Sequence, residues 1–193
     1  MAGASLALAA YLLGSVSFGL LLAKRRGVDL RAVGSGNIGA TNVRRALGAE
    51  AGRAVMVLDA LKGLVPTLAA RVALGPGDPW VAVAGVCAVL GHCYPLWHGG
   101  RGGKGAATTG GVLLAACPPA GVVMLATYLA LKKLTGRASV GSLAGAALGA
   151  LVTALALGEA PRTWMALALF ALIVVRHRAN LGRLVRGEEP RSG

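Results

Sequence analysis

The sequence contains few charged and few aromatic residues. Charged side chains make up 14% of the 193 residues, against roughly a quarter in a typical soluble domain. Aromatic side chains make up only 4%, which excludes a large aromatic core. Hydrophobic residues reach 55%, and the mean hydropathy is +0.67. This composition disfavours a soluble domain and indicates an all-α integral membrane protein.

Acidic residues are particularly scarce, and cysteines are few. Seven Asp and Glu face 20 Lys and Arg, which gives a formal net charge of +13. An excess of this kind is typical of proteins that bind nucleic acid or a lipid surface. The three cysteines, Cys87, Cys93 and Cys117, show no CxxC spacing. They therefore predict neither a disulfide framework nor a metal site.

Long apolar windows predict seven transmembrane helices, because a bilayer core needs about 20 apolar residues as a helix. The windows cover residues 1–23, 54–74, 79–100, 105–117, 119–131, 138–158 and 163–175. No basic residue precedes the apolar stretch of the first window, so we expect a retained helix and not a cleaved signal peptide. We expect the whole chain, 1–193, to form a single membrane-embedded domain.

Two of these windows come from one long apolar stretch, 105–131, which Pro118 and Pro119 interrupt. Consecutive prolines remove backbone donors and disfavour helix before them. Basic residues flank both ends of the stretch, so both ends are expected on the same side of the membrane. We therefore predict a hairpin of two short helices, the fourth and the fifth.

The basic residues also predict the orientation. Seventeen of the 20 Lys and Arg lie in segments 24–53, 98–104, 132–137 and 176–191, which the seven-helix topology places on one side. The positive-inside rule makes that side cytoplasmic, with the N-terminus outside and the C-terminus in the cytoplasm. Inside the window 54–74, Asp59 and Lys62 lie three residues apart on one helical face and could form an ion pair.

The first polar segment, 34–45, reads GSGNIGATNVRR. It contains a formal GxGxxG, but a membrane helix precedes it where a dinucleotide site needs a strand. Its backbone N–H groups, hydroxyls and arginine suit a phosphate or a carboxylate, although a plain tight turn would also use glycine. The candidate binding residues are Gly34, Ser35, Gly36, Asn37, Thr41, Asn42 and Arg45.

The second polar segment ends in a basic, glycine-rich run before a predicted helix. Lys104 is followed by Gly105 and not by Ser or Thr, so the run is not a P-loop. Free N–H groups at a helix start, together with Lys104, predict an anion site; the alternative is a basic loop near lipid headgroups. The candidates are Arg101, Gly102, Gly103, Lys104, Gly105 and Thr108.

The third segment follows the last apolar window. His177 and Asn180 lie three residues apart, among the arginines Arg176 and Arg183, and Glu189 follows. A basic juxtamembrane tail is common, but the histidine and the asparagine favour a functional role. Three such segments on one face predict an anion-handling site, for two phosphates or for one large polyanion.

In this order the three segments resemble the motifs of the bacterial acyl-phosphate-dependent glycerol-3-phosphate acyltransferases (PlsY-type). They are similar to that family's GSGNxGATNxxR, GHxxPxxxxxKGGKGxAT and RHxxNIxRLxxGxE. Arg101 stands where the family usually has Lys. The segment 58–63 is also similar to a recurrent LDxxKG element. The resemblance implies a seven-helix enzyme of the bacterial cytoplasmic (inner) membrane, with its active site on the cytoplasmic face.

The resemblance also implies the reaction and the residue roles. A fatty acyl group would pass from acyl phosphate to the sn-1 hydroxyl of glycerol 3-phosphate, giving lysophosphatidic acid and phosphate. Ser35 and Arg45 would bind substrate phosphate. Lys104 would bind the other phosphate, together with the backbone of Gly102, Gly103 and Gly105. His177 and Asn180 would position the acceptor. Glu189 would organise the arginines. Beyond the two substrates and membrane lipid, no cofactor, metal, nucleic acid or obligate protein partner is implied.

Three points stay open from the residues alone. No HxxxxD motif is present, because Gly182 stands five residues after His177, so the proton acceptor is either His177 or a substrate phosphate oxygen. An organic-phosphate transporter is an alternative, although no comparable polar residues would line an outside mouth and no internal repeat is visible. A lipid-phosphate hydrolase is another, although the predicted cytoplasmic acidic residues lack metal-ligand spacing.

Overall fold

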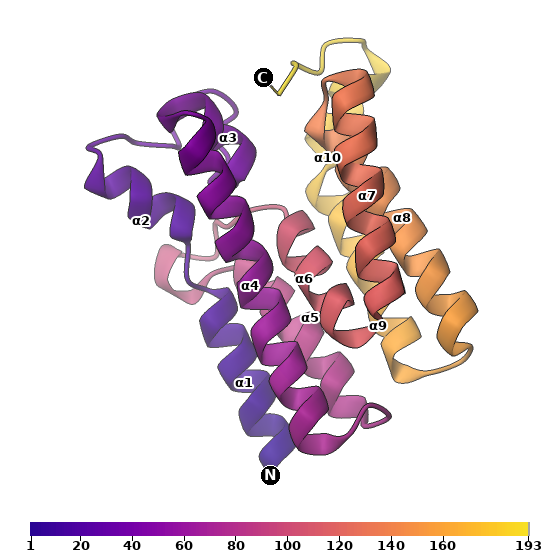
Figure 1. Cartoon of the computed structure of the whole chain (residues 1–193). Coiled ribbons are helices and arrows are strands. Elements are labelled where there is room, and N and C mark those ends of the chain that lie inside the picture. The colour runs from indigo at the N-terminus through magenta and orange to yellow at the C-terminus, as the bar shows by residue number, and fades with distance from the viewer. Residues whose placement is uncertain (193) are drawn as a thin grey trace.

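The computed structural model describes residues 1–192, and its regular elements are all helices (Figure 1). This confirms the predicted all-α class. In chain order the elements are α1 (Ala2–Gly14), α2 (Phe18–Arg25), α3 (Ala40–Leu47), α4 (Ala49–Leu74), α5 (Pro79–Cys93), the 3-10 turn η1 (Leu96–His98), α6 (Ala106–Ala116), α7 (Pro118–Thr135), α8 (Ala138–Leu157), α9 (Pro161–Arg176) and α10 (Arg178–Val185).

The long helices form two packed groups with α6 between them (Figure 1). Helix α1 packs on α5 and α4, while α7 packs on α8 and α8 on α9. Helix α6 contacts both groups, most extensively through α4. The main buried cluster is rich in alanine and valine, and such small side chains let helices approach closely. A Cβ atom on Gly63 of α4 would collide with the carbonyl of Thr108 of α6.

The predicted helix over 1–23 is broken in the structure. Helix α1 ends at Gly14, and α2 begins at Phe18 and runs in a different direction (Figure 1). The break leaves the carbonyl of Val16 free of a helical partner, and the Lys62 ammonium donates to it over 2.8 Å. The expectation of one continuous helix was wrong, since the helical conformation is interrupted over residues 15–17, although Ala2–Arg25 as a whole is long and apolar enough for one membrane span.

The ion pair expected inside the membrane is present. Asp59 Oδ1 and Lys62 Nζ lie 3.0 Å apart, and both side chains are buried in α4. The Nδ1 atom of His92, on α5, is 3.6 Å from the same carboxylate oxygen. A buried pair is stable only when its remaining polar atoms find partners. The carbonyl of Val16 supplies one of them.

The prolines break the chain where predicted, since α6 ends at Ala116 and α7 begins at Pro118. Helix α6 is short, with 11 residues. The expectation of an equally short partner was wrong. Helix α7 has 18 residues and runs to Thr135, where Gly136 in the left-handed conformation ends it. Helix α5 also ends early, at Cys93, so the expected window 79–100 continues as a loop.

Within residues 1–192, three segments are long and apolar enough to cross a membrane: Ala2–Arg25, Pro79–His98 and Ala138–Leu157. A fourth qualifies if α9 and α10, which are bent by 61°, count as one span. This supports several membrane crossings. The seven-helix count and the orientation stay predictions.

Candidate active site

The three polar segments meet around one cavity of about 760 Å³. Its lining includes a polar group of side chains from the loop before α3, from α3 itself, from the loop before α6 and from the chain after α9. These are Ser35, Asn37, Thr41, Asn42, Arg45, Lys104, His177, Asn180, Arg183 and Glu189. Gly34 and Gly105 complete the polar part of the wall. Segments far apart in the sequence thus form one site, as predicted.

Glu189 is the centre of the polar contacts in this cavity. Its buried carboxylate accepts hydrogen bonds from Asn180 Nδ2 at 2.6 Å and from Ser139 Oγ at 2.8 Å. Arg183 Nε donates to the other carboxylate oxygen at 2.8 Å. Burial alone would raise the pKa of Glu189, but these hydrogen bonds outweigh it and hold the pKa below its ordinary value. The carboxylate is therefore ionised.

Lys104 joins the same network, because its Nζ donates to Asn180 Oδ1 over 2.6 Å. Burial lowers the pKa of Lys104 to about 8, and the nearby positive charges of Arg183 and Arg45 add to this effect, although Glu189 opposes it. Each nearby positive charge disfavours the protonated, charged form of Lys104. An anion in the cavity would relieve this repulsion, so the cavity is suited to bind phosphate.

His177 lies at the bend between α9 and α10. Its Nδ1 is 2.9 Å from the carbonyl oxygen of Ile173. A carbonyl can only accept, so we assign the proton of the neutral ring to Nδ1, which leaves Nε2 as an acceptor. Burial lowers the pKa of His177 to about 4, and the charge of Lys104 contributes. The ring is therefore neutral near pH 7.

Two asparagines predicted to bind substrate hold the first loop in shape. Asn42 donates to the carbonyls of Leu30 and Val33, at 3.0 and 2.9 Å, and its Oδ1 accepts the N–H of Ser35. Asn37 accepts the N–H of Gly39. Both line the cavity, but backbone contacts use both side-chain polar atoms of Asn42 and the Oδ1 atom of Asn37. Of this loop, the hydroxyl groups of Ser35 and Thr41 are better placed to bind a ligand.

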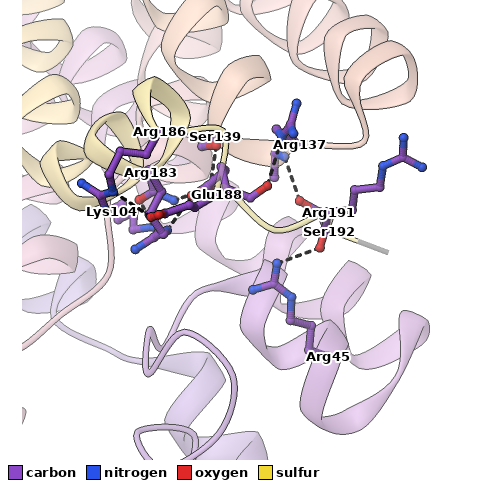
Figure 2. A network of polar contacts seen from close by, with 12 residues as sticks. Arg45, Lys104, Arg137, Ser139, Arg183, Arg186, Glu188, Arg191 and Ser192 are labelled. Carbon is purple, nitrogen blue, oxygen red and sulfur yellow. Dashed lines mark hydrogen bonds and ion pairs between the residues drawn. The ribbon is translucent and has the colours of Figure 1, made fainter.

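Arg45 crosses from α3 to the end of the chain, where its Nη2 donates to the carbonyl of Arg191 at 2.9 Å (Figure 2). Arg137 donates to the carbonyl of Glu189 in the same terminal segment. The segment after α10 therefore lies beside the cavity and is tied both to α3 and to the start of α8.

The glycine-rich loop before α6 differs from expectation. The N–H groups of Gly102 and Gly103 donate to the carbonyls of Cys93 and His92, both at 3.1 Å. The carbonyls of both glycines accept hydrogen bonds from Arg176, whose guanidinium lies 5.0 Å from the Tyr94 ring centroid. In this structure these groups hold the loop that presents Lys104.

The other expected residues of this region also lie apart from the cavity wall. Arg101 is exposed, with its carbonyl bonded to Arg31, and Thr108 is fully buried in α6. Gly36, with a φ of +65°, supports the turn of the first loop. Sequence reasoning missed Ser139, because one serine in an apolar helix gives no signal. It also missed that Asp59 and His92 reach the cavity wall.

Comparison with known proteins identifies this arrangement. A family model described as glycerol-3-phosphate acyltransferase matches residues 4–187. This chain belongs to the glycerol-3-phosphate acyltransferase family. Curated acyltransferases of that name include one from Anaeromyxobacter sp. (strain Fw109-5), which is 50% identical over 98% of this chain and 96% of its own length. One from Aquifex aeolicus is 44% identical over 94% of this chain and 95% of its own length.

Solved acyltransferase structures give the same result. One is a crystal structure of PlsY, an integral membrane glycerol 3-phosphate acyltransferase, in its glycerol 3-phosphate form. It matches this chain with a TM-score of 0.97 and 41% sequence identity. The match covers 100% of this chain and 96% of that chain. Its lysophosphatidic acid form has a TM-score of 0.93 at 39% identity, over 99% and 95%. The resemblance inferred from the motifs is confirmed, and the chain is a multi-pass membrane acyltransferase.

Glu189→Gln tests the network around Lys104. An amide cannot accept from Asn180, Ser139 and Arg183 as a carboxylate does, so Asn180 loses its fixed orientation and Lys104 its partner. Hydrogen bonds to charged groups contribute about 1.5 to 3 kcal/mol each, so we expect kcat/KM for acyl transfer to fall by about tenfold or more. The matched control is Glu188→Gln, since Glu188 is exposed and pairs only with Arg186. Equal activities of the two variants would contradict this assignment.

Proposed function

We propose that this acyltransferase moves a fatty acyl group from acyl phosphate to the sn-1 hydroxyl of glycerol 3-phosphate. The products would be lysophosphatidic acid and inorganic phosphate, as in the first step of phospholipid synthesis. The observation that carries the proposal is one cavity with a cationic end at Lys104 and Arg45 and an apolar end between helices. A donor with a phosphate head and an acyl tail matches both ends. The relatives solved in glycerol 3-phosphate and lysophosphatidic acid forms support it.

Ser35 and Arg45 would bind substrate phosphate at the first loop. Lys104 would hold the other phosphate, together with the N-terminus of α6, where Gly105 is the N-cap residue. These groups would stabilise the charge that develops on the carbonyl oxygen and on the departing phosphate. His177 and Asn180 would position glycerol 3-phosphate. Asn37, Asn42, Gly102, Gly103 and Arg176 would act by shaping the two loops.

In the reaction, the oxygen of the acceptor hydroxyl attacks the acyl carbon, and the bond from that carbon to the phosphate oxygen breaks. The hydroxyl group must lose its proton in this step. Phosphate is a good leaving group and needs little protonation. A histidine with a pKa of about 4 is a weak base at neutral pH. We therefore propose that His177 Nε2 orients the hydroxyl, and that a substrate phosphate oxygen takes the proton.

The site would face the cytoplasm, in the bacterial inner membrane. The concentration of Lys and Arg in four segments supports an outside N-terminus and a cytoplasmic C-terminus. The chain would form a single domain, with seven membrane segments corresponding to α1–α2, α4, α5, α6, α7, α8 and α9.

The reaction is tested with protein purified in detergent, supplied with palmitoyl phosphate and glycerol 3-phosphate. We expect phosphate release that requires the acceptor and that matches the lysophosphatidic acid formed, as measured by mass spectrometry. Phosphate release without acceptor would instead favour a lipid-phosphate hydrolase. Absence of turnover, with uptake of glycerol 3-phosphate into proteoliposomes, would favour an organic-phosphate transporter.

The pKa of Lys104 predicts a pH dependence. Since kcat/KM reports the ionisation of the free enzyme, it should decline as the pH rises through about 8, where Lys104 loses its charge. Lys104→Arg should remove this decline, whatever its absolute activity, because a guanidinium stays protonated. The matched control is Lys24→Arg, at an exposed position on α2. An unchanged decline in Lys104→Arg would exclude Lys104 as its source.

His177→Gln separates the two possible proton acceptors. If the histidine only orients the acceptor, the KM for glycerol 3-phosphate should rise while kcat stays within about tenfold, since the glutamine keeps a hydrogen-bonding group. A side-chain base contributes about 10² to 10⁴ in rate. A fall of that size in kcat at saturating acceptor would overturn the role proposed for the substrate phosphate.

A further inference from the structure

The apolar part of the cavity is walled by one stripe of side chains from each of three helices. Each stripe repeats at three- to four-residue spacing, as one face of a helix does. The stripes are Met56, Val57, Ala60, Leu61 and Leu64 on α4; Ala106, Ala107, Gly110, Gly111 and Leu114 on α6; and Gly121, Met124, Leu125 and Tyr128 on α7. Val57 and Leu125 remain 53% and 47% exposed. The groove therefore opens sideways between α4 and α7, where the bilayer would lie.

Two adjacent glycines of α6 differ in what surrounds them. A Cβ on Gly111 would collide with the carbonyl of Ala60, so the packing of α6 on α4 requires a glycine there. A Cβ on Gly110 would meet no heavy atom within 4 Å. Glycine inside a helix is less stable than alanine. No contact within the protein accounts for this cost at Gly110.

The position of Gly110 relative to the polar site indicates what fills the space. It lies on the cavity-facing stripe, four residues after the start of α6 at Ala106, or about 6 Å along the axis at the rise of an α-helix. A phosphate held at Lys104 would direct an attached acyl chain along this stripe. The cavity is continuous between the two places. The occupant that fits both ends is the hydrocarbon tail of the acyl donor.

We propose that Gly110 is a specificity-determining residue, which keeps the groove open so that long acyl chains can pass between α4 and α7. The proposal rests on the proposed acyl-phosphate reaction. It adds the residue that limits the length of the acyl chain in the donor. A larger side chain at 110 would occupy the path of the tail some carbons beyond the reacting carbonyl. It would leave the phosphate sites and the acceptor site unchanged.

The variants Gly110→Leu and Gly110→Ala, the second of which adds a smaller side chain, are assayed with butyryl, octanoyl and palmitoyl phosphate. We expect Gly110→Leu to lower kcat/KM for palmitoyl phosphate by about tenfold or more, the effect of displacing roughly two methylene groups from apolar contact. Butyryl transfer should change by less than about twofold by the same reasoning. The KM for glycerol 3-phosphate should stay as in the unmodified protein.

Gly111→Ala is the matched control, because its methyl group would be directed against the carbonyl of Ala60 on α4 and would disturb helix packing. We expect it to lower the melting temperature in detergent and to reduce transfer from all three donors alike. If Gly110→Leu behaves in this way, or shows no loss with palmitoyl phosphate, the proposal is wrong. If Gly110→Leu is not recovered from membranes, Gly110→Val decides the same comparison. Failure of the unmodified protein with every donor would instead refute the proposed reaction itself.

Discussion

The hydrogen-bonded carboxylate of Glu189 is the interaction around which the cationic end of the cavity is arranged. It accepts from Ser139 of α8 and from Asn180 and Arg183 of α10, and Asn180 in turn accepts from Lys104. A buried carboxylate without such partners would cost several kcal/mol. One negative charge does not balance the cations around it, so the free site keeps a positive excess. In the proposed reaction, substrate phosphates would balance the remaining positive charge.

A second buried cluster supports the loop that carries Lys104. Asp59 joins Lys62 on its own helix and lies close to His92 of α5, and the carbonyl of His92 accepts the N–H of Gly103. The residue after Gly103 is Lys104. A Cβ on Gly103 would also collide with the His92 ring. Polar groups within the helices thus hold the loop that carries Lys104, and the same cluster supplies a hydrogen-bond partner for the carbonyl of Val16 at the helix break.

The sequence predicted which segments meet more reliably than what each residue does there. Polar, glycine-bearing runs at helix ends identified the three loops, and Pro118 located the turn between α6 and α7. The roles of Gly102 and Gly103 were not readable, because a glycine N–H can face a ligand or pair with a distant carbonyl. The break at Val16 was hidden for a similar reason, since the partner of its carbonyl, Lys62, is remote in the sequence.

In the proposed reaction, phosphate binding and proton removal would be carried out by different groups of this site. Burial and positive neighbours lower the pKa of Lys104 to about 8 and that of His177 to about 4. An arriving phosphate reverses the effect on Lys104, because opposite charge favours the charged form. It also brings oxygens that bind protons more strongly than the neutral His177 does in the free site. In the proposed reaction, the pocket would bind two phosphates, its histidine would be a weak base, and a substrate phosphate oxygen would accept the proton. Acyl transfer through a reactive anhydride suits such a pocket, since positioning and charge stabilisation can provide most of the rate.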